Sequence, residues 1–84
     1  MKFESYKKTV ISATREAMNE ERMIYNELIE ESPEEKYEYS LMRSAGIEGV
    51  AKGIIAIVET SEYSFSQKES IKKAIKMQSE EYKK

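Results

Sequence analysis

The side chains that could do chemistry in this chain are Glu, Lys, Tyr, Ser and Thr, because the sequence contains no His, Cys or Asp. General acid–base catalysis most often uses His, and a Ser or Lys nucleophile needs an adjacent base. Zinc sites are built mainly from Cys and His, and calcium loops are rich in Asp and Asn. The sequence therefore predicts no catalytic residue, no metal site and no cofactor, and we expect the protein not to be an enzyme.

Carboxylates form the densest group of potential ligands. Glu27, Glu30 and Glu31 have helical spacing, but helical di-iron sites also use Glu-x-x-His, and this chain has no His. Residues 16–38 as a whole hold nine Glu against Arg22 and Lys36, a net charge of −7. Such a surface attracts a basic partner, and Tyr is enriched at binding hot spots. The sequence thus predicts a partner-binding acidic elbow made of Glu27, Glu30, Glu31, Glu34, Glu35, Tyr37, Glu38 and Tyr39.

In a competing interpretation, basic side chains of the same chain neutralise these acids. Residues 1–15 and residues 68–84 each carry a net charge of +3. A third helix that folds back toward the elbow would place its lysines along the acidic half of the first helix, where exposed pairs contribute little. The lysines concerned are Lys68, Lys72, Lys73 and Lys76. The sequence leaves both interpretations open.

Three helices must position these residues. Apolar residues recur at three- and four-residue steps over residues 3–31, which predicts one long helix. The segment Ser32-Pro33-Glu34-Glu35 fits a capping box with Pro at the first helical position, so a second helix is expected over about 33–60. Ser66-Gln67-Lys68-Glu69 fits another capping box, so a third, shorter helix is expected over about 67–82. The predicted fold is all-α: an antiparallel hairpin of two long helices plus a third, in one domain of residues 1–84.

The second helix has two unusual features. Tyr37, Leu41, Ala45, Ile54, Ile55 and Val58 should form its inner face, yet residues 47–58 are apolar nearly all round. This pattern predicts a homodimer through a self-association surface of Ile47, Val50, Ile54, Ile57 and Val58. Its glycines, Gly46, Gly49 and Gly53, each cost a helix about 1 kcal/mol relative to Ala. They indicate either a break near Gly46 or close helix–helix contact.

No apolar run reaches the roughly 18 residues of a membrane span. The start, Met1-Lys2-Phe3-Glu4, lacks the hydrophobic core of a signal peptide. We therefore expect a cytoplasmic protein that does not enter a membrane.

These features favour a non-enzymatic protein–protein interaction module, an acidic inhibitor, adaptor or regulator that binds a host or cellular protein with a basic surface. In size and charge the chain is similar to bacteriophage and mobile-element products of that kind, which is an analogy and not a motif match. One alternative is an acidic nucleic-acid mimic that blocks a nuclease or a DNA-binding protein. Another is a DNA-binding regulator using the Lys-rich third helix, although direct nucleic-acid binding fits poorly with only three Arg in an acidic chain.

Overall fold

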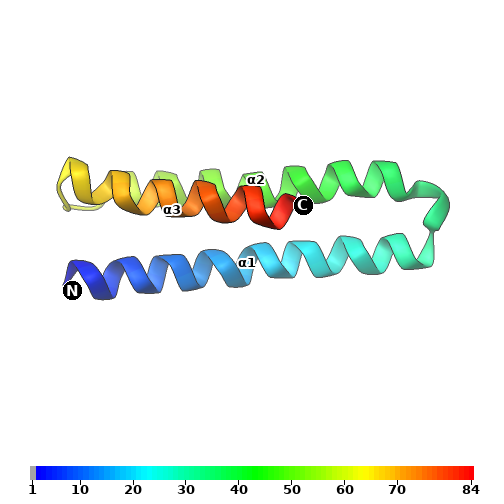
Figure 1. The fold of residues 1–84 in the computed structure, drawn as a ribbon, viewed down its shortest axis with the longest axis horizontal. Coiled ribbons are helices and arrows are strands. Elements are labelled where there is room, and N and C mark those ends of the chain that lie inside the picture. Colours follow the sequence, from blue (N-terminus) through cyan, green and yellow to red (C-terminus); the bar gives the residue numbers. More distant parts are fainter. Residues whose placement is uncertain (1) are drawn as a thin grey trace.

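The computed structural model describes residues 2–84, and Met1, the first residue of the expected domain, lies outside them. Within residues 2–84 the chain forms three α-helices, one 3-10 turn and no strand: α1 Phe3–Glu31, η1 Pro33–Glu35, α2 Lys36–Glu59 and α3 Phe65–Lys83. The predicted all-α class with three helices is confirmed. Figure 1 shows α1 along the whole molecule, α2 returning beside it from the elbow at residues 32–35, and α3 lying against them.

The elbow begins at Ser32, directly after the last residue of α1, Glu31. The Ser32 N–H still donates to the Leu28 carbonyl, at 2.9 Å, and the Ser32 carbonyl accepts from Glu35 N–H, at 3.0 Å. The predicted capping box at Ser32 is wrong, because the Ser32 side chain makes no capping hydrogen bond. Residues 33–35 instead form a tight 3-10 turn with Pro33 at its start, and this turn satisfies the Glu35 amide through backbone alone.

The start of α3 also differs from the prediction. Ser64 is the capping residue: its hydroxyl accepts from Gln67 N–H at 3.3 Å, and Gln67 Oε1 accepts from Ser64 N–H at 3.0 Å. The capping box predicted at Ser66 and Glu69 is therefore wrong by two residues. The segments that begin at Ser64 and at Ser66 both fit the capping-box pattern. Glu69 instead forms an ion pair with Lys72 at 2.8 Å.

The helix α2 continues without a break through all three glycines, none of which has a positive φ. A break near Gly46 is therefore excluded. Close helix–helix contact exists at Gly46 only, where an added Cβ would lie 2.6 Å from Glu21 Oε2 of α1. An added Cβ at Gly49 or Gly53 would meet no atom within 4 Å.

The core lies where all three helices run together. Its buried apolar side chains come from each helix: Met18, Ile47, Ala51, Val58, Ile71 and Ile75. Buried Thr14 beside them donates its hydroxyl proton to the Val10 carbonyl at 2.7 Å. Between residues 19 and 46, by contrast, no residue is buried. One end of the molecule therefore has no core of its own.

The reason is the length of α3. With 1.5 Å of rise per residue, the 29 residues of α1 extend about 43 Å and the 19 residues of α3 only about 28 Å. The last turn of α3 lies beside Arg22, whose guanidinium stands 4.6 Å from the Tyr82 ring centroid, and beside Glu48, whose carboxylate is 3.5 Å from Lys83 Nζ. Beyond this point α1, η1 and α2 continue without a third helix. We call residues 23–46 the open end.

Because α3 is short, the predicted inner face of α2 is only partly buried. Val58 is buried, and Ile54 and Ile55 pack against the core, as predicted. Tyr37, Leu41 and Ala45 are exposed instead, Tyr37 by 76% and Leu41 by 55%. Leu41 is exposed because α3 ends before it reaches this part of α2.

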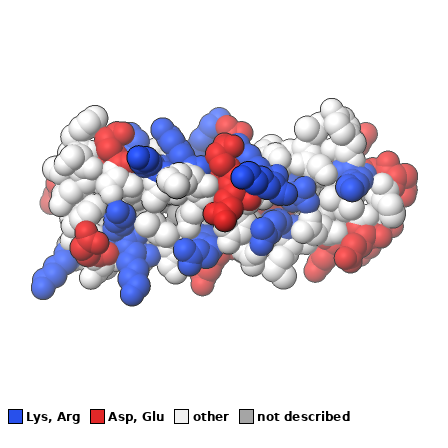
Figure 2. Space-filling model, viewed as in Figure 1, with Lys and Arg blue, Asp and Glu red and all other residues white. Residues whose placement is uncertain are grey.

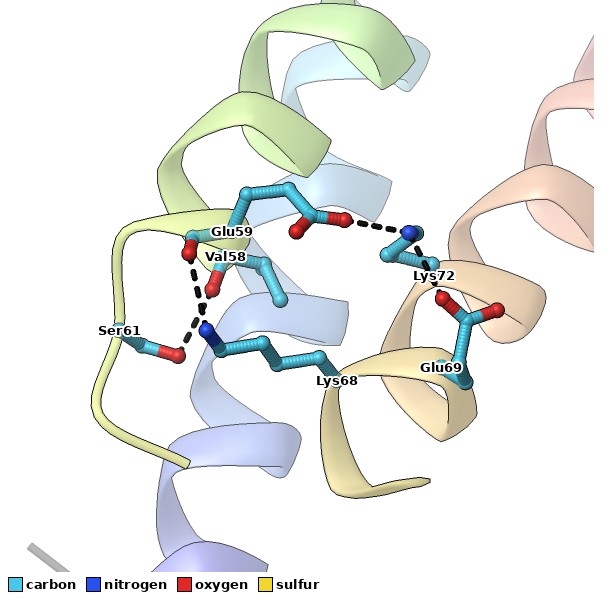
Figure 3. A network of polar contacts seen from close by, with 6 residues as sticks. All are labelled: Val58, Glu59, Ser61, Lys68, Glu69 and Lys72. Atoms are coloured by element: carbon cyan, nitrogen blue, oxygen red, sulfur yellow. Dashed lines mark hydrogen bonds and ion pairs between the residues drawn. The ribbon is translucent and has the colours of Figure 1, made fainter. Parts of the chain in front are cut away.

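The α2–α3 connection is held by polar contacts around Glu59 (Figure 3). Lys72 Nζ contacts the carboxylates of both Glu59 and Glu69, and Lys68 Nζ donates to the Glu59 carbonyl at 3.0 Å. The hydrogen bond and charge of Lys72 hold the pKa of Glu59 below its ordinary value of 4.5. The hydrogen bonds from Lys72 to Glu59 and Glu69, together with the charges of these carboxylates, raise the pKa of Lys72. On the other side of this connection, the Tyr63 ring stands 5.4 Å from that of Phe3 and 4.8 Å from that of Tyr6.

We expect Glu59→Gln to lower the melting temperature at pH 7, because it removes the ion pair with Lys72. A carboxyl whose pKa is lowered by folding stabilises the fold above its unfolded pKa, and this contribution is lost as pH falls through the folded value. The difference between Glu59→Gln and the unmodified chain should therefore shrink as pH falls below 4.5 and vanish in strong acid. Thermal unfolding followed by circular dichroism across pH 2–8 measures it. The exposed Glu62, which forms no ion pair, gives the control Glu62→Gln; equal effects of the two substitutions would contradict the assignment.

Candidate functional site

The open end exposes most of the large apolar side chains that the molecule leaves uncovered. Within residues 2–84 there are eight exposed large apolar residues, and five of them belong to the open end: Met23, Ile24, Tyr37, Leu41 and Met42. Leu41 lies seven residues, two helical turns, before Glu48, which contacts Lys83 of α3. Leu41 therefore stands on the side of α2 that α3 covers further along. The path of α3 thus continues onto an exposed apolar surface.

The structure brings the predicted acidic elbow together. Glu27, Glu30 and Glu31 lie in the last two turns of α1, Glu34 and Glu35 lie in η1, and the remaining members lie in the first turn of α2: Tyr37, Glu38 and Tyr39. All eight border the same connection, and Figure 2 shows Glu side chains gathered at this end of the molecule. Seven of the eight are exposed, and Tyr39 is half-buried.

These acids are not neutralised within the chain. Within residues 2–84, the glutamates that form ion pairs are Glu48, Glu59, Glu69 and Glu80, all of them outside residues 16–38. The interpretation that the α3 lysines lie along the acidic half of α1 is wrong. The first turns of α3 lie beside the basic start of α1, where Lys7 Nζ donates to Ser70 Oγ at 2.7 Å, and α3 ends before it reaches the elbow.

The pKa of Tyr39 reflects the negative electrostatic potential at the elbow. A hydrogen bond and the charge of Glu35, followed by burial and by the charges of Glu38 and Glu34, raise the pKa of the Tyr39 hydroxyl above its ordinary value of 10.0. Each carboxylate disfavours a second negative charge nearby. The elbow therefore presents a concentrated negative field to an approaching molecule.

The predicted self-association residues lie mostly inside the chain. Ile47 and Val58 are fully buried in the core, and Val50 and Ile54 pack against it. Ile57 alone of the five is a large exposed side chain, with 63% of its surface accessible. Four of these residues are thus occupied by contacts within one chain.

Of the exposed apolar residues of the open end, sequence reasoning selected only Tyr37 as a binding residue. Leu41 was assigned to the inner face, because periodicity shows that a helix has an apolar side but not how far its neighbour extends. The one available signal was length, since the predicted third helix of about 16 residues is too short to cover a first helix of 29.

Other kinds of site find little support in the geometry. A surface hollow of about 820 Å³ is lined by residues of α3 and by Lys84, and the α3 residues include Lys72, Lys73, Lys76 and Met77. Among residues 2–84 no three potential ligand side chains are grouped to hold a metal ion, and no helix has the length and apolar character to cross a membrane. Comparisons with protein-family models, with curated proteins and with solved structures give no match.

We expect Glu35→Gln to lower the pKa of Tyr39 toward 10.0, because Glu35 is the largest cause of its elevation. An NMR titration of the Tyr39 ring resonances measures this shift. The control is Glu27→Gln, which removes one charge from the same elbow but is not among the groups that raise the Tyr39 pKa. An unchanged pKa in Glu35→Gln, or equal shifts in both variants, would show that the hydrogen bond does not form.

Proposed function

We propose that the protein is a non-enzymatic protein–protein interaction module whose open end binds a basic amphipathic helix of another protein. The observation that carries the proposal is the early end of α3, which leaves residues 23–46 with exposed apolar side chains and no buried residue. A partner helix placed there would extend the path of α3 and bury this surface. Helix-in-groove recognition of this kind uses apolar anchors at helical spacing.

The charge of the open end specifies the partner. Acidic side chains without ion pairs border the apolar surface, so a helix with Lys or Arg beside its apolar stripe gains attraction over a neutral or acidic one. Binding of this kind blocks or recruits the protein that carries the helix. The proposed role is therefore that of an inhibitor, adaptor or regulator.

A synthetic helical peptide with Leu at helical spacing and Lys elsewhere is a suitable probe, with the same peptide carrying Glu in place of Lys as its counterpart. We expect the Lys peptide to bind and the Glu peptide not to bind, with affinity falling as salt is raised. Leu41→Ser should weaken binding at least about tenfold, since burying a Leu contributes about 1.5–3 kcal/mol. Fluorescence anisotropy of the labelled peptide measures both effects.

The matched control is Met77→Ser, because Met77 is exposed by 65% but lies on α3, away from the open end. This substitution should leave the affinity for the Lys peptide unchanged. Equal binding of the two peptides, or equal effects of Leu41→Ser and Met77→Ser, would contradict the proposal.

A nucleic-acid mimic is the second candidate, favoured by the nine glutamates of residues 16–38 that form no ion pair. Such a mimic would bind a basic groove of another protein through charge alone, without using the exposed apolar side chains of the open end. Joint charge reversal at Glu27, Glu31 and Glu34 should then abolish binding to a DNA-binding protein or nuclease, while Leu41→Ser has no effect. Loss of binding in Leu41→Ser would instead support the helix-binding module.

A further inference from the structure

The outer face of α2 is a second uncovered surface, distinct from the side that α3 contacts. Ala45, Gly49, Gly53 and Ile57 follow one another at four-residue steps, and all four are exposed. Met42 and Ala56 are exposed beside them. These six residues, which we call the outer face, include no charged side chain.

Two glycines of this face have no explanation inside the chain. Gly46 accommodates Glu21 of α1, but the space beside Gly49 and Gly53 is empty to 4 Å. Neither has a positive φ, so their backbone conformation does not require glycine. Glycine destabilises a helix relative to Ala, whereas small residues let the backbone of another helix approach closely.

We propose that the outer face of α2 binds the outer face of a second copy of the chain, with the two α2 helices antiparallel. A two-fold axis level with Ala51 places Gly49 opposite the partner's Gly53. The same axis places Ala45 opposite the partner's Ile57, so the largest side chain of the face meets one of the smallest. The outer face is thus complementary in shape to itself.

The distribution of charge along the chain favours an antiparallel arrangement of the two copies. The acidic segment 16–38, with its net charge of −7, includes the elbow, and the basic residues 1–15 lie at the opposite end of α1. An antiparallel pair sets the acidic end of each chain beside the basic end of the other, whereas a parallel pair sets two acidic elbows side by side. Beside the outer face, Glu48 and Lys52 are 3.6 Å apart, and this axis brings Glu48 of one copy within one helical turn of the level of Lys52 of the other.

Disulfide trapping tests the orientation, because the chain has no cysteine of its own. Met42 and Thr60 lie nine residues on either side of Ala51, and both are exposed. When Met42→Cys and Thr60→Cys chains are mixed under mild oxidation, we expect the mixed disulfide to exceed both same-residue disulfides at least about tenfold, a ratio corresponding to about 1.4 kcal/mol. Met77→Cys, on α3, is the control for random collision. Predominance of same-residue disulfides, or yields no higher than with Met77→Cys, would overturn the proposal.

Sedimentation equilibrium tests the interface without cysteine. The unmodified chain should be dimeric at about 1 mM, and Gly49→Gln with Gly53→Gln should raise the dimer dissociation constant at least about tenfold. Gln favours helix over Gly, so the thermal midpoint of the monomeric variant should not fall, which separates loss of association from loss of folding. Met77→Gln serves as the matched surface control. A monomeric unmodified chain, or unchanged association in the glycine variant, would overturn the proposal.

Discussion

The packing of α3 against α1 and α2 is the constraint on which the other features of the molecule depend. Ile71 and Ile75 of α3 are fully buried against Met18 and Ile47, and the core extends no further than this helix does. Arg22 over the Tyr82 ring and Lys83 beside Glu48 mark its last turn. The same chain therefore has one end organised around a three-helix core and another end built from two helices with exposed apolar side chains.

Charge is divided in the same way. Every ion pair within residues 2–84 involves a residue of α3 or the neighbouring part of α2, so the attraction between side chains reinforces the end that already has a core. The glutamates of the elbow form no ion pair within residues 2–84, and Glu34, Glu35 and Glu38 raise the pKa of Tyr39. The stabilising contacts are thus concentrated at the three-helix end of the molecule, and the negative charge is concentrated at the elbow.

Local sequence signals predicted the helices well. Uninterrupted periodicity defined α1, and Pro33 located the start of the turn that leads into α2. The errors arose where two nearby segments fit the same capping pattern, or where the burial of a residue depends on a neighbouring helix. Ser64 and Ser66 both begin a capping pattern, and Leu41 has the spacing of a core residue but no α3 beside it. The elbow glutamates could be selected from sequence because charge density is visible there, whereas the exposure of Leu41 depends on how far another helix extends.

The missing core of the open end also affects how this region moves. Separating the ends of α1 and α2 there breaks the hydrogen bond between Arg43 and Asn26, yet exposes no fully buried side chain. Local opening therefore costs less free energy at the elbow than around Ile47 and Ile75, and backbone amides near the elbow should exchange with solvent sooner. A ligand held between these helix ends would suppress such opening, so its affinity includes the cost of ordering them.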